Sequence, residues 1–156
     1  MPPDRQNTPL LEMPGLACAC AGVRRAARLV TQLYASEMGT RLEPSQFALL
    51  FALSRQPGCS QAALGRALGF DKTTLSRNLR LLLRNGWIEI AKAGDQRERG
   101  CRLTTAGKQL LASTRPGWKR AQAKLRAALA EGEWESMLQM FDRVARAAWD
   151  ARAQSH

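Results

Sequence analysis

The segment from Asp95 to Gly107 constrains the fold more than any other part of the sequence. It begins with a stretch rich in charge and glycine, which is typical of an exposed hairpin tip. It continues as Cys101-Arg102-Leu103, a candidate strand, and then reaches Thr104, a residue type that caps helices. The alternating stretch Trp87–Ile90 precedes it and is the candidate partner strand. The sequence therefore predicts a two-stranded hairpin that leads directly into a helix.

Two short helices separated by a tight turn are predicted just before this hairpin. Ser60 can cap the first helix, Gly69 makes the turn, and Asp71 can cap the second helix, which runs to Asn85. Gly86 is placed to end that helix in a left-handed conformation. The inward-facing positions expected in the first of these helices are Leu64, Ala67 and Leu68. A helix, a turn, a helix and a hairpin in this order predict a winged helix-turn-helix.

Longer helices are predicted on both sides of this unit, so the fold class is mainly α, with a small β element (α+β). Residues 1–15 are Pro-rich and read as a flexible lead-in, and residues 16–156 form a single domain. Within it, residues 44–104 form the winged helix-turn-helix head, whereas residues 16–43 and 105–156 supply the terminal helices. Pro116 lies inside the helix that starts at Thr104 and is expected to kink or break it. Apolar positions form one stripe on the last helix, at Trp134, Met137, Leu138, Phe141, Val144 and Trp149.

The helix that follows Asp71 has two distinct faces. Leucines at helical spacing are expected to face the core, at Leu75, Leu79, Leu82 and Leu83. The opposite face carries hydroxyl groups near its amino end and guanidinium groups further along, a pattern that suits base edges and phosphates in a DNA major groove. The candidate DNA contacts on this helix are Lys72, Thr73, Thr74, Ser76, Arg77 and Arg80. A solvated basic face is the simpler alternative.

The hairpin tip supplies the other candidate contacts. Arg97 and Arg99 can reach a minor groove, whose negative potential attracts arginine. Asp95 is two residues before Arg97 and can orient it, or can serve only as a turn residue. Thr104 and Gly107 are expected to be structural, as a helix cap and a close-packing position.

Composition narrows the function further. The formal charge of +11 favours a polyanionic partner. The sequence contains no apolar run long enough to cross a membrane and no secretory signal, so a cytoplasmic location is expected. No constellation of residues indicates an enzyme, a cofactor site or a metal site. The alternative to sequence-specific regulation is a winged helix that docks proteins or binds DNA without sequence preference.

Three motifs in order resemble the MarR family of bacterial regulators: the run from Gln61 to Arg77, then Leu83-x-x-x-Trp87-Ile88, then Asp95-x-Arg97 followed by Leu103-Thr104-x-x-Gly107. The resemblance spans about residues 16–150. It implies a homodimer in which the terminal helices form the dimerisation layer. It also implies binding to double-stranded DNA at a near-palindromic operator, usually as a repressor that a small ligand or an oxidant releases. One departure is Gly65, where such a motif more often has alanine.

The resemblance also directs attention to two candidate sensing regions. Cys18 and Cys20 begin the first helix and are candidates for oxidation or for binding a thiophilic metal, although inert packing is the common role of cysteine. Cys59 and Cys101 are interpreted as packing residues. The family's effector pocket would lie between the dimerisation layer and the head, and an arginine-lined cleft there would suit a phenolic or other aromatic acid. Candidate pocket walls are Arg24, Arg28, Phe47, Phe51 and Trp118.

Overall fold

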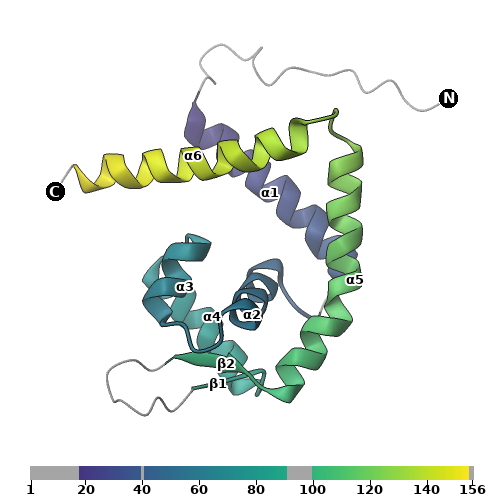
Figure 1. Cartoon of the computed structure of the whole chain (residues 1–156), viewed down its shortest axis with the longest axis vertical. Helices are drawn as coiled ribbons and strands as arrows, with labels where there is room; N and C mark the ends of the chain where they lie inside the picture. Colours follow the sequence, from purple (N-terminus) through teal and green to yellow (C-terminus); the bar gives the residue numbers. More distant parts are fainter. Residues whose placement is uncertain (1–17, 40, 91–99, 155–156) are drawn as a thin grey trace.

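A computed structural model describes residues 18–39, 41–90 and 100–154 of the chain. Its elements are α1 (Ala19–Met38), α2 (Pro44–Arg55), α3 (Gln61–Leu68), α4 (Lys72–Arg84), β1 (Ile88–Ile90), β2 (Cys101–Leu103), α5 (Thr105–Ala127) and α6 (Glu133–Ala153). Figure 1 shows α2, α3, α4 and the two strands gathered in a lower head, with α1, the upper part of α5 and α6 above it. The predicted class, mainly α with a small wing sheet, is confirmed. No helix in the described part of the chain combines the length and the apolar character needed to cross a membrane.

Local capping fixes the ends of the head helices where the sequence predicts them. The Ser60 side chain accepts a hydrogen bond from the Ala63 backbone N–H at 3.2 Å and so caps α3. Gly69 follows α3 and Gly86 follows α4, with φ of 67° and 68°. These left-handed conformations strain any residue with a Cβ, which is why glycine is found at both turns.

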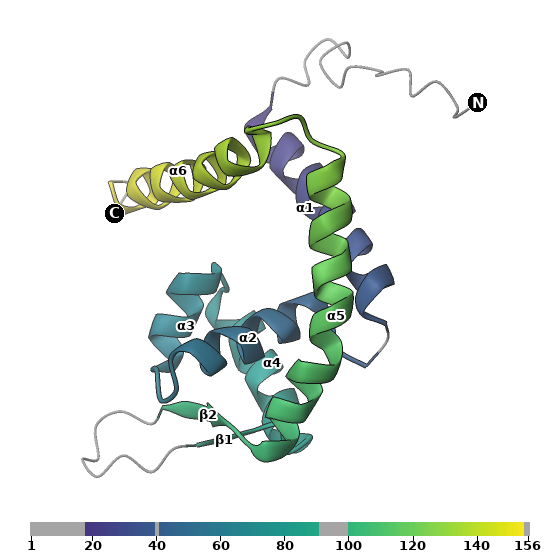
Figure 2. The ribbon, with the colours of Figure 1, turned by 45° about the vertical axis from the view of Figure 1, so that its right-hand side comes forward.

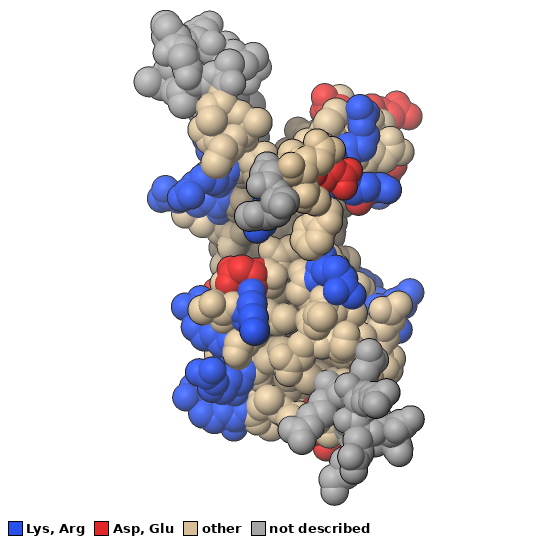
Figure 3. Space-filling view, turned by 90° about the vertical axis from the view of Figure 1, so that its left-hand side faces the viewer, with Lys and Arg blue, Asp and Glu red and all other residues tan. Residues whose placement is uncertain are grey.

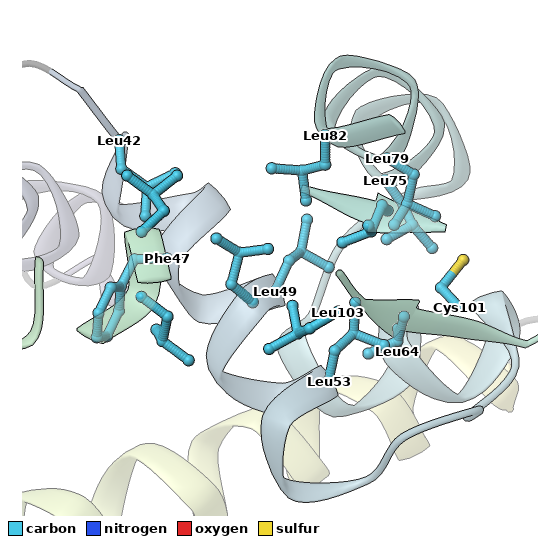
Figure 4. Packing of buried hydrophobic residues seen from close by; sticks show 14 residues of the cluster. Leu42, Phe47, Leu49, Leu53, Leu64, Leu75, Leu79, Leu82, Cys101 and Leu103 are labelled. Carbon is cyan, nitrogen blue, oxygen red and sulfur yellow. The ribbon is translucent and has the colours of Figure 1, made fainter. Parts of the chain in front are cut away.

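Leucines from α2, α3 and α4 form the centre of the head, together with residues of both strands. Leu49, Leu50, Leu53 and Leu82 are fully buried, and Figure 4 shows labelled core side chains from α2, α4 and β2 converging. The expected inward position of Ala67 is wrong.

The α3 face that packs against α4 contains Gly65 rather than Ala67. Ala67 is exposed and Gly65 is buried. A Cβ at Gly65 would lie 3.3 Å from Leu75 Cδ2, so the small residue permits the close packing of α3 on α4. The departure from alanine therefore has a local packing reason.

The antiparallel pair of β1 and β2 is joined closely to the start of α5. Glu89 lies opposite Arg102, and their side chains form an ion pair at 2.7 Å. The Thr104 hydroxyl donates to the Gly86 carbonyl at 2.6 Å and accepts from the Gly107 N–H at 3.1 Å. This confirms the capping role of Thr104. The strand begins at Ile88 rather than Trp87, and the Thr104 N–H donates to the Trp87 carbonyl at 3.1 Å just beyond the paired residues.

Helix α5 passes through Pro116 without a break and connects the head to the upper helices. The ribbon bends between its lower and upper parts (Figures 1 and 2), as expected for an interior proline. At the next position, a Cβ on Gly117 would be 2.3 Å from the Glu37 carbonyl oxygen, so α1 and α5 cross there in direct backbone contact. Arg120 and Lys124 both pair with the Glu37 carboxylate and hold the crossing from one side.

Helices α1 and α6 contain no buried residue. Figure 2 shows α6 extending sideways above the head from the upper end of α5, and its stripe remains open, with Phe141 50% and Trp149 60% exposed. Helix α5 ends at Ala127, and Gly132, with φ of 79°, precedes α6. The Arg126 guanidinium lies 5.9 Å from the centre of the Trp134 ring and links the two helices.

Candidate nucleic-acid interface

The Asp71 side chain caps the amino end of helix α4. The Thr74 backbone N–H and hydroxyl donate to the two carboxylate oxygens of Asp71 at 2.8 and 2.6 Å. These hydrogen bonds favour the ionised carboxylate and lower the pKa of Asp71. Leu75, Leu79 and Leu82 are buried on the inner side, which fixes the rotation of the helix about its axis. The rotation predicted from the leucine spacing is therefore confirmed.

The outer side of α4 carries the predicted contact residues. Lys72, Thr73, Ser76, Arg77 and Arg80 are all exposed, whereas Thr74 is partly buried. Figure 3 shows lysine and arginine side chains gathered along one edge of the head. In the described part of the chain, no acidic group forms an ion pair with the arginines of α4. Their charge is thus available to a polyanion.

A groove of about 630 Å³ runs between α4 and the amino end of α2. Its lining residues are Glu43, Ser45, Gln46, Thr74, Arg77, Asn78, Arg80, Leu81 and Arg84. The Glu43 N–H donates to Gln46 Oε1 at 3.2 Å in a capping box, which fixes this end of α2 beside the arginines. Sequence reasoning missed Ser45, Gln46 and Asn78. Only the polar cluster at the start of α2 could have signalled the first two.

The predicted wing contacts Asp95, Arg97 and Arg99 lie outside the described residues. The strands on either side of this segment are described, and their Glu89–Arg102 pair joins them at the base of the hairpin. The contact and orienting roles assigned to these three residues therefore stay predictions.

A second cleft of about 270 Å³ lies where α1, α2 and α5 meet. It contains three of the predicted pocket residues, Phe47, Phe51 and Trp118, with ring centres 5.8 to 6.0 Å apart and nearly parallel planes. The other two, Arg24 and Arg28, are exposed on α1 and do not line the cleft. Both arginines lie nearer the amino end of α1 than the cleft residues Tyr34 and Met38, and their role in an effector pocket stays a prediction.

The four cysteines fall into two environments. Cys18 and Cys20 are exposed at the start of α1, with Cys18 at the position that precedes the first helical residue. Cys101 is buried and Cys59 packs against the same core, and burial raises the pKa of both thiols. Raised pKa values disfavour the reactive thiolate, in keeping with the packing role predicted for this second pair. No cluster of metal-ligating side chains occurs within the described ranges.

Comparisons with known proteins agree with this geometry. A sequence profile described as MarR family matches residues 42–98. The Mycobacterium tuberculosis transcriptional regulator MosR, solved in complex with DNA, is 30% identical with a TM-score of 0.76, over 86% of this chain and 98% of that one. The Streptomyces coelicolor regulator PcaV, solved with its natural ligand, is 26% identical with a TM-score of 0.76, over 90% and 96%.

A probable transcriptional regulator from Pseudomonas aeruginosa is 25% identical with a TM-score of 0.72, over 82% of this chain and 97% of that one. A comparison with curated protein sequences finds no match. The profile covers the head, and the structural matches extend along almost the full length of each relative. The chain therefore belongs to the MarR family of transcription regulators.

Proposed function

We propose that this protein is a homodimeric, sequence-specific transcription repressor that binds a near-palindromic operator in double-stranded DNA. The observation that carries the proposal is the exposed basic face of α4, fixed by the Asp71 cap and free of acidic partners among the described residues. The 30% identity to MosR, whose structure contains DNA, supports this use of the face. A cytoplasmic location follows from that role.

The proposed contacts divide into two sets. Lys72, Thr73, Thr74, Ser76, Arg77 and Arg80 contact the major groove and its phosphates. Arg97 and Arg99 reach the minor groove, with Asp95 orienting Arg97. The proposal assigns the protein no enzymatic reaction.

The domain organisation proposed is a head of residues 44–104 on a dimerisation layer of residues 16–43 and 105–156. The open apolar stripe of α6 supports this division, because a helix with no buried residue needs a covering surface. A two-fold dimer would place the two α4 helices about one DNA turn apart, roughly 34–36 Å.

The decisive experiment selects binding sites from a pool of randomised DNA duplexes with the purified full chain. We expect enrichment of an inverted repeat whose half-sites are about 10 base pairs apart. A pool without enrichment, bound with equal affinity throughout, would instead support a non-specific architectural role. No DNA binding at all would support a protein-docking role.

Release by an effector is the second half of the proposal. The cleft between α1, α2 and α5 is the proposed site for a small molecule, and the exposed thiols Cys18 and Cys20 are proposed to respond to an oxidant or a thiophilic metal. Operator affinity before and after hydrogen peroxide treatment tests the thiols. We expect a loss that disappears in Cys18→Ser and in Cys20→Ser. An unchanged loss in both variants would exclude these thiols as the sensor.

A further inference from the structure

The groove between α4 and the amino end of α2 contains a buried carboxamide with an unused donor. Gln46 is only 8% exposed, and its Oε1 accepts the hydrogen bond from the Glu43 N–H. Its Nε2 donates to no group in the described part of the chain. Every described side-chain nitrogen or oxygen that is sealed from solvent has a partner, so this Nε2 reaches open surface. Because Gln46 lines the groove, its amide offers a free donor to an occupant of the groove.

The first turn of α2 offers further donors beside this amide. The amides of a first helical turn have no partner within the helix unless a cap supplies one. Pro44 has no N–H, and the Glu43 carboxylate accepts from the Gln46 N–H. The Glu43 carbonyl accepts from the Phe47 N–H at 2.9 Å. The N–H and the hydroxyl of the half-buried Ser45 therefore remain without a partner among the described residues.

Arginines of α4 give the other wall of this groove a positive charge. Arg77, Arg80 and Arg84 line the groove, and none of them forms an ion pair within the described ranges. Glu43 is the one acidic residue in the described lining. Three guanidinium groups against one carboxylate leave a surplus of positive charge. Several free donors beside such a surplus are complementary to a phosphate group, which is a charged acceptor.

We propose that the amino end of α2 is an additional DNA contact, where Ser45, Gln46 and Arg84 hold one backbone phosphate beside the major groove that α4 reads. The inference rests on the proposed function and extends it, because the contacts proposed above come only from α4 and the wing. Arg77 and Arg80 belong both to the groove and to the exposed face of α4, so a duplex on that face brings its backbone to the groove.

The three residues are positioning residues rather than readers of sequence. A phosphate contact fixes the register and orientation of a protein on the duplex and carries no direct sequence information. By holding the backbone at the start of α2, this contact sets how α4 lies in the major groove.

Methylphosphonate scanning of the selected operator tests the contact, because this substitution removes the charge of one backbone phosphate and leaves the bases intact. Each phosphate of one half-site is replaced in turn, and the affinity of the full chain is measured by band shift at fixed salt. At one position we expect replacement to weaken binding by the parent at least about fivefold and binding by Arg84→Ala less than about twofold. If Arg84→Ala kept the parent's loss at every position, the proposal would be overturned.

Arg115→Ala is the matched control for this scan. It removes an exposed arginine from α5, outside the groove, and should keep the parent's loss at every phosphate. Loss of the same single position in Arg115→Ala would contradict a local contact at the start of α2.

Two exchanges of similar shape test the lining itself. Glu43→Gln keeps an acceptor for the Gln46 N–H and removes a negative charge, so it should tighten operator binding about two- to fivefold. Gln46→Glu keeps an acceptor for the Glu43 N–H but replaces the donating amide by a carboxylate, so it should weaken operator binding at least about tenfold. Gln56→Glu adds the same charge at the exposed carboxyl end of α2 and should change affinity less than about twofold.

The double variant Glu43→Gln, Gln46→Glu separates a contact at Gln46 from the net charge of the groove. It has the same net charge as the parent and should still bind the operator at least about threefold more weakly, because it lacks the Gln46 donor. Equal affinity of the double variant and the parent would overturn the proposal. The scan and Glu43→Gln decide the question if Gln46→Glu does not fold.

A free phosphate ion has the same chemistry as a backbone phosphate, and calorimetry distinguishes the two sources. We expect inorganic phosphate to bind the full chain, without DNA, no more tightly than about 1 mM. Tighter binding, together with a scan that shows no Arg84-dependent position, would identify a free-ion site and overturn the DNA contact.

Operator binding by the parent separates this inference from the proposed function. A parent chain that binds its selected operator, with variants at Gln46 and Arg84 that bind it equally well, refutes the α2 contact alone. A parent chain that binds no operator refutes the proposed function.

Discussion

At the scale of single residues, the contact between Gly107 and the Trp87 backbone leaves no room for a side chain. An ideal Cβ at Gly107 would lie 1.9 Å from the Trp87 carbonyl oxygen. Since that oxygen is backbone and also accepts from the Thr104 N–H, it cannot move without disturbing the joint between β1 and α5. We expect Gly107→Ala to lower the free energy of unfolding by about 2–3 kcal/mol, measured by urea denaturation.

The matched control is Gly22→Ala in α1, where a Cβ would meet nothing within 4 Å. Alanine has a higher helix propensity than glycine in an exposed helix interior. This variant should therefore be as stable as the parent or up to about 1 kcal/mol more stable. If Gly107→Ala and Gly22→Ala lowered the free energy of unfolding equally, the contact with the Trp87 carbonyl would be excluded as the cause.

The Asp71 cap should make stability depend on pH in a defined direction. Hydrogen bonds from Thr74 lower the folded-state pKa of Asp71 below its ordinary value of 3.8. The stabilisation is therefore present above that ordinary value and is lost as pH falls through the lower, folded-state pKa. We expect Asp71→Ala to melt at a lower temperature than the parent near neutral pH, with the gap narrowing below about pH 4.

Asp71→Asn separates the cap from the charge, because asparagine also accepts a hydrogen bond from the backbone at this position. We expect this variant to melt close to the parent near neutral pH. It should lack the additional fall in melting temperature that protonation of Asp71 causes at low pH. If the difference in melting temperature between the parent and Asp71→Ala stayed constant down to about pH 3, the ionised Asp71 carboxylate would be excluded as its source.

At the scale of elements, the basic face of α4 should carry much of the operator affinity. Arg77 and Arg80 are exposed, without acidic partners among the described residues, and beside the groove at the start of α2. We expect Arg77→Ala to weaken operator binding about 10- to 100-fold in a band-shift assay at fixed salt, since a lost base or phosphate contact costs about 1–3 kcal/mol. Arg115→Ala on α5 removes the same charge from another exposed helix and should change affinity less than threefold.

The elements also show which features a sequence determines locally. The caps at Ser60, Asp71 and Thr104 are predictable because each depends on a side chain and a backbone group three residues away. The exposure of Ala67 and the exclusion of Arg24 from the cleft depend on how helices far apart in sequence pack. Periodicity identifies an apolar face, but it does not say which helix will cover that face.

At the scale of the whole molecule, the uncovered stripe of α6 is the proposed dimer surface. We expect Phe141→Glu to shift the protein from dimer to monomer in sedimentation equilibrium, because it places a charge where a half-exposed ring would be buried on association. Burial of one such ring contributes about 1.5–3 kcal/mol, and a symmetric dimer loses two. Gln139→Glu adds the same charge two residues away, on the opposite side of α6, and should leave the protein dimeric.

The salt dependence of binding tests the head and the dimer together, because it depends on how many phosphates the whole assembly neutralises. Each phosphate contact contributes about −0.9 to the slope of log affinity against log salt concentration. A dimer presents every α4 contact twice. If Arg77 contacts a phosphate, Arg77→Ala should make the slope less steep by about 1.8, and by half that if only one head engages DNA. An unchanged slope with weaker binding would instead place Arg77 on a base edge, whereas Arg115→Ala should alter neither quantity.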